Sequence, residues 1–194
     1  MNVEEMQAKF KGKRTLFLPS DIDRPKVDRI GDGILEFNFE SGEDIKLLID
    51  SGGGRTVPSF NLADLIMASK ARVIGIVIGV CRSSAVTILQ ACHRRLSFPH
   101  SVFLVHSVRQ EISFKISQTE KTVRLLVRDR IREGRIHQRN VEEMILRRSN
   151  MPRKKLRELM RNGDLFNSDL SAREALKLGL IDEIIDPSII SYIF

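Results

Sequence analysis

Ser83 stands at a point in the chain where a nucleophilic hydroxyl would be exposed. The β-branched, apolar run 72–80 predicts a strand buried on both faces, and residues 85–92 return to helical spacing. A serine on the turn between such a strand and helix can project its Oγ, while the N–H of Ser84 lies at the positive end of the helix. The same pattern also allows a simpler role, in which Ser83 or Ser84 only caps the helix.

Two further features would complete the machinery for acyl transfer, which needs a base and oxyanion donors as well as a nucleophile. His106 ends the apolar run 102–106 and could accept the serine proton, although a histidine at this position can also be structural. The glycine triplet 52–54 follows the apolar run 45–49, and glycines either let backbone N–H groups approach a ligand or simply form a turn. Each feature alone is ambiguous, and their combination predicts serine chemistry.

The elements that would position these residues alternate between strand and helix. We expect strands at 15–18, 45–49, 72–80, 95–98 and 102–106, the last two as a short pair, and helices at 24–38, 61–70 and 85–92. Because strand, polar turn and helix alternate between residues 45 and 92, the sequence predicts crossover units in an α/β domain.

The second half of the chain is mostly helical in composition. Residues 116–148 place apolar side chains among charged ones and predict a long helix, with a break near Gly134. Pro152 suits the first turn of a next helix, and the pair Asn162-Gly163 predicts its C-terminal end.

The C-terminal region carries a clear helix start. Ser171 with Glu174 forms a capping-box pattern, which predicts a helix from Ser171 to Lys177. Gly179 would end this helix, and the run 180–185 predicts a last strand.

Charge and composition narrow the classes of partner and compartment. The chain of 194 residues has a formal charge of +7, and the segment 121–161 holds 14 Lys and Arg against 5 Asp and Glu. No aromatic residues stand between these basic ones, which favours a solvated helical face over a nucleic-acid-binding surface. The longest apolar run, 73–81, is far shorter than the ~20 residues of a membrane-spanning helix.

The first residues and the cysteines indicate a reducing compartment. Residues 1–14 are polar and charged and lack the apolar core of a secretory signal. Cys81 and Cys92 have no metal-ligand spacing around them, so neither a zinc site nor a disulfide framework is predicted. We therefore expect a cytoplasmic protein that does not act at a membrane.

Several motifs resemble those of the Clp protease proteolytic subunit family. Residues 50–54, Asp-Ser-Gly-Gly-Gly, resemble its Asn-Ser-Pro-Gly-Gly loop, and residues 78–85, Ile-Gly-Val-Cys-Arg-Ser-Ser-Ala, resemble its Gly-Gln-Ala-Ala-Ser-Met-Gly nucleophile segment. Residues 98–106, Phe-Pro-His-Ser-Val-Phe-Leu-Val-His, resemble its Leu-Pro-Asn-Ser-Arg-Val-Met-Ile-His segment. Residues 171–175 and 179–182 resemble its Ser-Ala-x-Glu-Ala and Gly-Leu-Ile-Asp motifs.

The resemblance extends from about Arg14 to Pro187 and implies a fold class and an organisation. The fold would be α/β, with ClpP/crotonase-like repeated β-β-α superhelical turns and a long handle helix through which two rings of subunits pack. The implied organisation is a short polar N-terminal segment at 1–14, a single domain at 15–187 with its handle at 116–148, and a C-terminal tail at 188–194.

The resemblance also implies an activity, which is cleavage of peptides or unfolded polypeptides by a serine endopeptidase in a homo-oligomeric ring. His106 would take the proton of Ser83, and N–H groups of Gly53, Gly54 and Ser84 would hold the oxyanion. No metal and no organic cofactor is needed for this chemistry.

The third member of the catalytic triad is the least determined. Register from Ser171 places Asn167 where the family has its aspartate, and an asparagine can orient an imidazole but cannot stabilise an imidazolium by charge. The stretch between residues 164 and 169 looks longer than in the family, so Asp164 and Asp169 are alternative partners for His106.

Two departures from the family pattern motivate other hypotheses. Arg82 replaces a small residue beside the nucleophile, where its bulk and charge could narrow or block the substrate site. The segment before Arg14 lacks the apolar content of loops that engage a ring ATPase, which argues against an unfoldase partner. Together, Asn167 and Arg82 motivate the alternative of a catalytically silent structural subunit of a mixed ring. A crotonase-type acyl-CoA enzyme and a basic nucleic-acid-binding module are the remaining alternatives.

Overall fold

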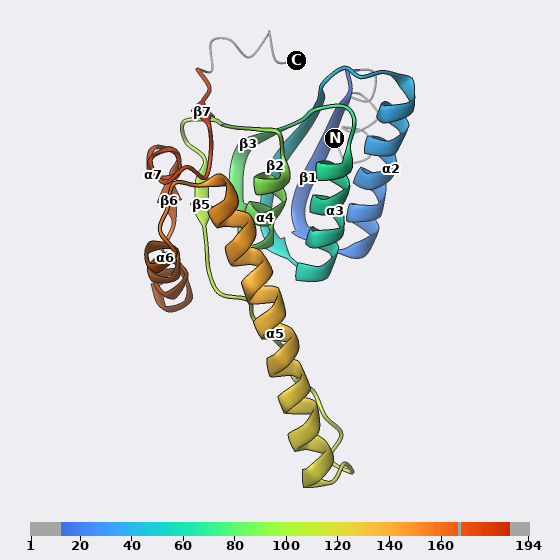
Figure 1. Cartoon of the computed structure of the whole chain (residues 1–194), viewed down its shortest axis with the longest axis vertical. Helices are drawn as coiled ribbons and strands as arrows, with labels where there is room; N and C mark the ends of the chain where they lie inside the picture. Colours follow the sequence, from blue (N-terminus) through green and yellow to red (C-terminus); the bar gives the residue numbers. More distant parts are fainter. Residues whose placement is uncertain (1–12, 167, 187–194) are drawn as a thin grey trace.

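A mostly parallel β-sheet forms the centre of the molecule (Figure 1). The structure is a computed structural model that describes residues 13–166 and 168–186. Strands that lie side by side in parallel are, in spatial order, β1 (Thr15–Ile22), β2 (Ile45–Gly54), β3 (Val73–Arg82), β4 (Arg94–Ser97) and β7 (Glu183–Ile184). The strands predicted at 15–18 and 45–49 are confirmed and are longer than expected. β2 continues through the glycine triplet because Gly53 and Gly54 still pair with the end of β1.

Strand β3 is long enough to pair with two different strands. Its residues Ile74 to Val77 pair with β4, and its end, Val80 to Arg82, pairs with β5 (Val102–Leu104). β6 (Leu170–Ser171) then runs antiparallel beside β5. The two short strands predicted between residues 95 and 106 therefore exist, but each pairs with β3 and they do not form a pair with each other.

Helices cover one face of the sheet (Figure 1). They are α2 (Arg24–Glu40), α3 (Thr56–Ala68) and α4 (Ser84–Ala91). Side chains alternate along each strand, so Leu16 and Leu18 of β1 pack beneath these helices, whereas Phe17 joins a smaller apolar cluster on the other face. α3 begins at Thr56, earlier than the predicted residue 61. Pro58 is tolerated in its first turn because proline lacks an N–H, and the N–H groups of a first turn have no partner within the helix.

The long helix α5 (Glu120–Arg148) extends away from the sheet, and the chain that precedes it runs back along it (Figure 1). The predicted break near Gly134 is wrong, since the helix continues through this residue. Gly134 instead permits a close contact, because a Cβ there would lie 2.9 Å from Cγ of Gln110. A hydrogen bond also fixes this segment to α5, because the N–H of Val108 donates to Oε1 of Gln138 at 2.8 Å.

Helix α6 (Arg153–Phe166) also passes through a glycine that the sequence predicted as its end. The predicted termination at Asn162-Gly163 is wrong. A Cβ on Gly163 would lie 2.2 Å from the carbonyl oxygen of Val105, so only glycine lets the helix pack this close to the backbone beside His106. The glycine therefore serves packing and not helix termination.

The last elements follow the predicted capping box. Helix α7 (Ala172–Lys177) begins with Ser171 Oγ accepting from the N–H of Glu174 at 3.3 Å, and the Glu174 carboxylate accepts from the N–H of Ser171 at 2.8 Å. The predicted strand 180–185 is shorter in the structure, where β7 covers only Glu183–Ile184.

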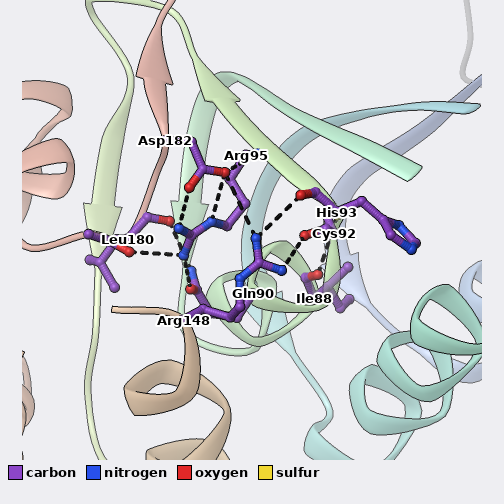
Figure 2. Close-up of polar contacts among 9 residues, drawn as sticks. Ile88, Gln90, Cys92, His93, Arg95, Arg148, Leu180 and Asp182 are labelled. Carbon is purple, nitrogen blue, oxygen red and sulfur yellow. Dashed lines mark hydrogen bonds and ion pairs between the residues drawn. The ribbon is translucent and has the colours of Figure 1, made fainter. Parts of the chain in front are cut away.

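A polar network fixes the base of α5 to the sheet (Figure 2). The buried guanidinium of Arg95 binds both carboxylate oxygens of Asp182 and donates to Oε1 of Gln90 at 2.5 Å. Arg148, at the end of α5, donates to the carbonyl oxygen of Cys92 at 3.0 Å. Burial alone would raise the pKa of Asp182, but the hydrogen bonds and charge of Arg95 lower it below its ordinary value.

Candidate functional site

Ser83 occupies a strained turn between β3 and α4. Its φ of 55° lies in the left-handed region, which is costly for a residue with a side chain. Its Oγ makes no capping hydrogen bond to α4, and Ser84 Oγ donates instead to the carbonyl oxygen of Gly54 at 2.9 Å. The geometry therefore gives no support to the helix-cap alternative for Ser83. A strained turn whose hydroxyl has no hydrogen-bond partner among the described residues is the arrangement expected of a nucleophile elbow.

The glycine triplet packs directly against this elbow. A Cβ on Gly53 would lie 2.6 Å from the Cβ of Ser83, so no larger residue fits at this position. Gly53 also has a φ of 96°, which favours glycine. Its N–H donates to Oγ of Ser51 at 3.1 Å and is thus engaged within the loop. Gly54, the next residue, lines the cavity described below.

Ser83 and His106 line the same cavity, which has a volume of about 240 Å³. The chain brings them together because β3 and β5 are adjacent parallel strands, and each residue lies just beyond the C-terminal end of its strand. The other lining residues come from the glycine loop, from α3, α4 and α5, and from the segment around His106 that follows β5; they are Gly52, Gly54, Thr56, Ser84, Thr87, Val105, Ser107, Val108, Arg109, Val141 and Ile145. A cavity of this volume could receive a small side chain beside the hydroxyl.

The imidazole of His106 is bound to its neighbour through Nδ1. Its Nδ1 lies 2.6 Å from the carbonyl oxygen of Ser107, which can only accept a hydrogen bond. The proton of a neutral ring therefore belongs on Nδ1, and Nε2 keeps a lone pair that can accept a proton.

Asp164 is the carboxylate beside this ring. Its Oδ1 lies 3.7 Å from Nδ1 of His106 and accepts a hydrogen bond from the N–H of Ser107 at 3.1 Å. Gly163 makes this placement possible, since its missing side chain lets α6 contact Val105. A negative charge at this distance favours the imidazolium that forms when the base takes a proton.

The other two candidates for the third position have different outcomes. Asp169 binds Arg82, with Oδ1 accepting from Nε at 2.9 Å and Oδ2 from Nη2. Asn167 lies outside the described residues. The sequence suggested that Arg82 could narrow the space beside Ser83. Among the described residues, however, Arg82 does not line the cavity.

Cys81, two residues before Ser83, is not a competing nucleophile. Its side chain is fully buried in β3, and burial raises the pKa of its thiol well above the ordinary value. A neutral, enclosed thiol is inert, because the thiolate is the reactive form.

The geometry also includes residues that the sequence did not single out. Ser107 supplies both the carbonyl that binds His106 and the N–H that binds Asp164. Arg109 lines the same cavity and adds a positive charge at its rim. Because Ser107 and Arg109 follow His106 closely in the sequence, their nearness to the site could have been suspected. Gly163, in contrast, is more than fifty residues from Val105, and its role follows only from the packing of α6.

Comparison with known proteins shows which family this chain belongs to. The profile of the Clp protease family matches residues 1–188. The chain belongs to the Clp protease family. Membership supports a peptidase function of the Clp protease type, and it confirms the family expected from the motifs.

Individual relatives are similar along most of their length. The ATP-dependent Clp protease proteolytic subunit of Oltmannsiellopsis viridis is 28% identical over 179 residues, which cover 89% of this chain and 84% of the relative. The ATP-dependent Clp protease proteolytic subunit 2 of Streptomyces coelicolor is 27% identical over 182 residues, which cover 92% of this chain and 78% of the relative. A further relative, subunit 3 of Arabidopsis thaliana, is described as chloroplastic.

A solved structure confirms the predicted ClpP-like α/β fold. It is a mutant of ClpP1 from Listeria monocytogenes in which an asparagine is replaced with aspartate. Its TM-score is 0.75 at 19% identity, and the match covers 93% of this chain and 96% of that one. Within the described residues, no helix is long and apolar enough to cross a membrane.

Proposed function

We propose that this chain is a serine endopeptidase subunit that cleaves peptides or unfolded polypeptides through an acyl-enzyme. The observation that carries the proposal is the free hydroxyl of Ser83 on a left-handed elbow, in one cavity with His106. The family supports peptide hydrolysis in general, and these side chains supply the serine-type chemistry.

The reaction would proceed in two halves. In the first, Nε2 of His106 accepts the proton of Ser83 as Oγ attacks the substrate carbonyl, and the imidazolium then gives that proton to the leaving amine. In the second, water donates its proton to His106 and attacks the acyl-enzyme, and the carboxylic acid leaves as Ser83 recovers its proton.

Backbone donors for the oxyanion come from two segments that meet at the elbow. Ser84 is the first residue of α4, so its N–H has no partner within the helix. Gly54 lies in the cavity wall, while the Gly53 N–H is bound to Ser51. The proposal therefore assigns the oxyanion to the N–H groups of Gly54 and Ser84, with Gly53 needed for close packing.

The charge behind His106 is assigned to Asp164. Its carboxylate lies 3.7 Å from Nδ1 and shares Ser107 with the ring. An asparagine at position 167 then need not supply the charge that the family obtains from its aspartate.

Covalent labelling tests the proposal. The purified chain is incubated with a fluorophosphonate probe, and the adduct is located by mass spectrometry in the wild type, Ser83→Ala and His106→Ala. We expect one adduct on Ser83 that Ser83→Ala abolishes and His106→Ala slows by about a hundredfold or more. A folded, assembled wild type that takes no label on Ser83 contradicts the proposal and favours the structural subunit of a mixed ring.

Assembly as a homo-oligomeric ring is part of the same proposal. The handle formed by α5 and the segment before it exposes apolar side chains, among them Phe114, Ile116 and Ile131. Exposed apolar patches of this kind mark interaction surfaces. Relatives named as subunits of an ATP-dependent protease also make an ATPase partner a reasonable candidate, which mass analysis of complexes formed in the presence of ATP would test.

A further inference from the structure

We infer that the ion pair between Arg82 and Asp169 is a positioning device that holds the nucleophile elbow and the start of β6 in register across β5. The inference rests on the proposed function, because its main effect is on the reactivity of Ser83. Arg82 and Asp169 are 87 positions apart in the chain, yet their side chains form a two-point contact. A guanidinium and a carboxylate bound in this way fix direction as well as distance.

The strand pairing explains why these two residues meet. Arg82 of β3 pairs with Leu104 of β5, and Phe103 of β5 pairs with Leu170 of β6. Since β6 is antiparallel to β5, the same register places Asp169, the residue before Leu170, opposite Leu104. The ion pair thus spans β5 and closes a loop of contacts through three strands.

Two of the strands joined by this loop of contacts, β3 and β5, lead directly to residues of the site. Arg82 directly precedes Ser83, whose own N–H donates to the carbonyl oxygen of Leu104 at 2.8 Å. His106 follows β5 by two residues. The clamp formed by Arg82 and Asp169 therefore fixes the strand ends that carry both the nucleophile and the base.

The strained backbone of Ser83 needs neighbouring contacts to hold it in place, and the clamp supplies one of them. A non-glycine residue at a φ of 55° persists only when its surroundings hold it there. The side chains of Arg82 and Asp169 are each 34% exposed, and partly exposed pairs contribute little to global stability. Loss of the clamp should consequently appear in the reactivity of Ser83 far more than in the melting temperature.

The experiment compares Arg82→Gln and Asp169→Asn with a charge reversal, in which Arg82→Asp is combined with Asp169→Arg. Arg94→Gln is the matched control, because Arg94 forms a similar ion pair with Glu183 between β4 and β7, away from the cavity. We measure the rate constant of fluorophosphonate labelling, kcat and KM for a peptide, and the melting temperature of each full-length variant.

Each single substitution in the clamp should slow labelling by roughly tenfold to a hundredfold, as expected for a misplaced reacting group. It should lower kcat with little change in KM and leave the melting temperature close to that of the wild type. The charge reversal should recover part of the labelling rate, and Arg94→Gln should label like the wild type. A purely structural role would not produce this pattern.

Unchanged labelling in both single variants, alongside a reactive wild type, overturns the clamp and leaves the proposed function intact. A change in KM alone also overturns it, because Arg82 would then contact substrate. If the wild type itself takes no label, the proposed function fails, and hydrogen exchange decides the clamp. In that case the amides of Ser83 and Leu170 must exchange faster in Arg82→Gln than in Arg94→Gln, and equal rates would overturn the inference.

Discussion

At the scale of single residues, the proposed base His106 lies beside two groups to which different tasks are assigned. The carbonyl of Ser107 fixes the proton on Nδ1, and Asp164 places a carboxylate 3.7 Å from the same nitrogen. These two tasks are separable, since a hydrogen bond sets the orientation and a charge lowers the free energy of the imidazolium.

Asp164→Asn should therefore lower kcat/KM by roughly tenfold or more, because it removes the charge while an amide oxygen can still accept from Ser107. Asn167→Ala should have the smaller effect. Glu158→Gln is a suitable control, since Glu158 lies on the same helix and, among the described residues, pairs with Lys155. Peptide hydrolysis with all three variants decides the assignment. A large loss in Asn167→Ala beside a normal Asp164→Asn would return the role to Asn167.

Much of the site follows from sequence pattern at this scale, and some of it does not. Ser83 and the glycine loop were predicted because a strand-to-helix turn and a glycine triplet leave local signatures. The choice among Asp164, Asn167 and Asp169 was open, because side-chain direction depends on Arg82 and Gly163, which are distant in the chain.

At the scale of elements, the site is assembled by the packing of α6 against β5 and α5. Glu142 of α5 is nearly buried and binds two arginines of α6, with Oε2 accepting from Arg153 at 2.5 Å and from Arg157 at 3.3 Å. Burial alone would raise the pKa of Glu142, but these arginines and Gln138 lower it below its ordinary value.

This shift predicts a pH-dependent contribution to stability. Because the folded-state pKa of Glu142 is lowered, its contribution is complete at neutral pH and is lost as the pH falls below its ordinary pKa and through the folded value. Glu142→Gln should lower the free energy of unfolding by about 1–2 kcal/mol at pH 7 and by much less near pH 3. Denaturant unfolding at both pH values measures the difference.

A second substitution controls for the general effect of losing a carboxylate. Glu143→Gln, next to Glu142 but exposed, should change the free energy of unfolding little at either pH. An equal loss for Glu142→Gln at pH 7 and pH 3 would show that the ion pair with α6 is not the cause.

Element prediction succeeded where patterns are local and failed at two glycines. The capping box of Ser171 and Glu174 involves neighbouring residues, so it was readable from sequence. The sequence predicted a helix break near Gly134 and a helix end at Gly163. Both residues in fact lie inside continuous helices, α5 and α6. Each glycine is needed for contact with a distant segment, which single-sequence patterns cannot reveal.

At the scale of the whole molecule, the handle carries the surface through which we propose that subunits assemble. Large apolar side chains are exposed on α5 and on the segment before it: Ile112, Phe114, Ile116, Leu125, Leu126, Ile131 and Ile136. Burying such a surface between subunits would stabilise an assembly by the hydrophobic effect.

Ile116→Asp, at a side chain that is 99% exposed, should therefore weaken assembly without unfolding the subunit. We expect sedimentation to show at least a tenfold higher concentration for half-assembly, since burying a charge in an apolar interface costs more than about 1.4 kcal/mol. Ser117→Asp adds the same charge beside it and removes no apolar surface. An assembly state that is unchanged in Ile116→Asp would exclude this part of the handle from the interface.

Peptide hydrolysis by Ser83 is tested by measuring cleavage of unfolded casein and of a fluorogenic peptide mixture by the assembled wild type and by Ser83→Ala prepared in parallel. We expect cleavage by the wild type and a loss of at least about a thousandfold in Ser83→Ala, as for removal of other serine nucleophiles. Cleavage that persists in Ser83→Ala would show that Ser83 is not the nucleophile, and its absence from an intact wild-type assembly would show that the chain is not a working peptidase.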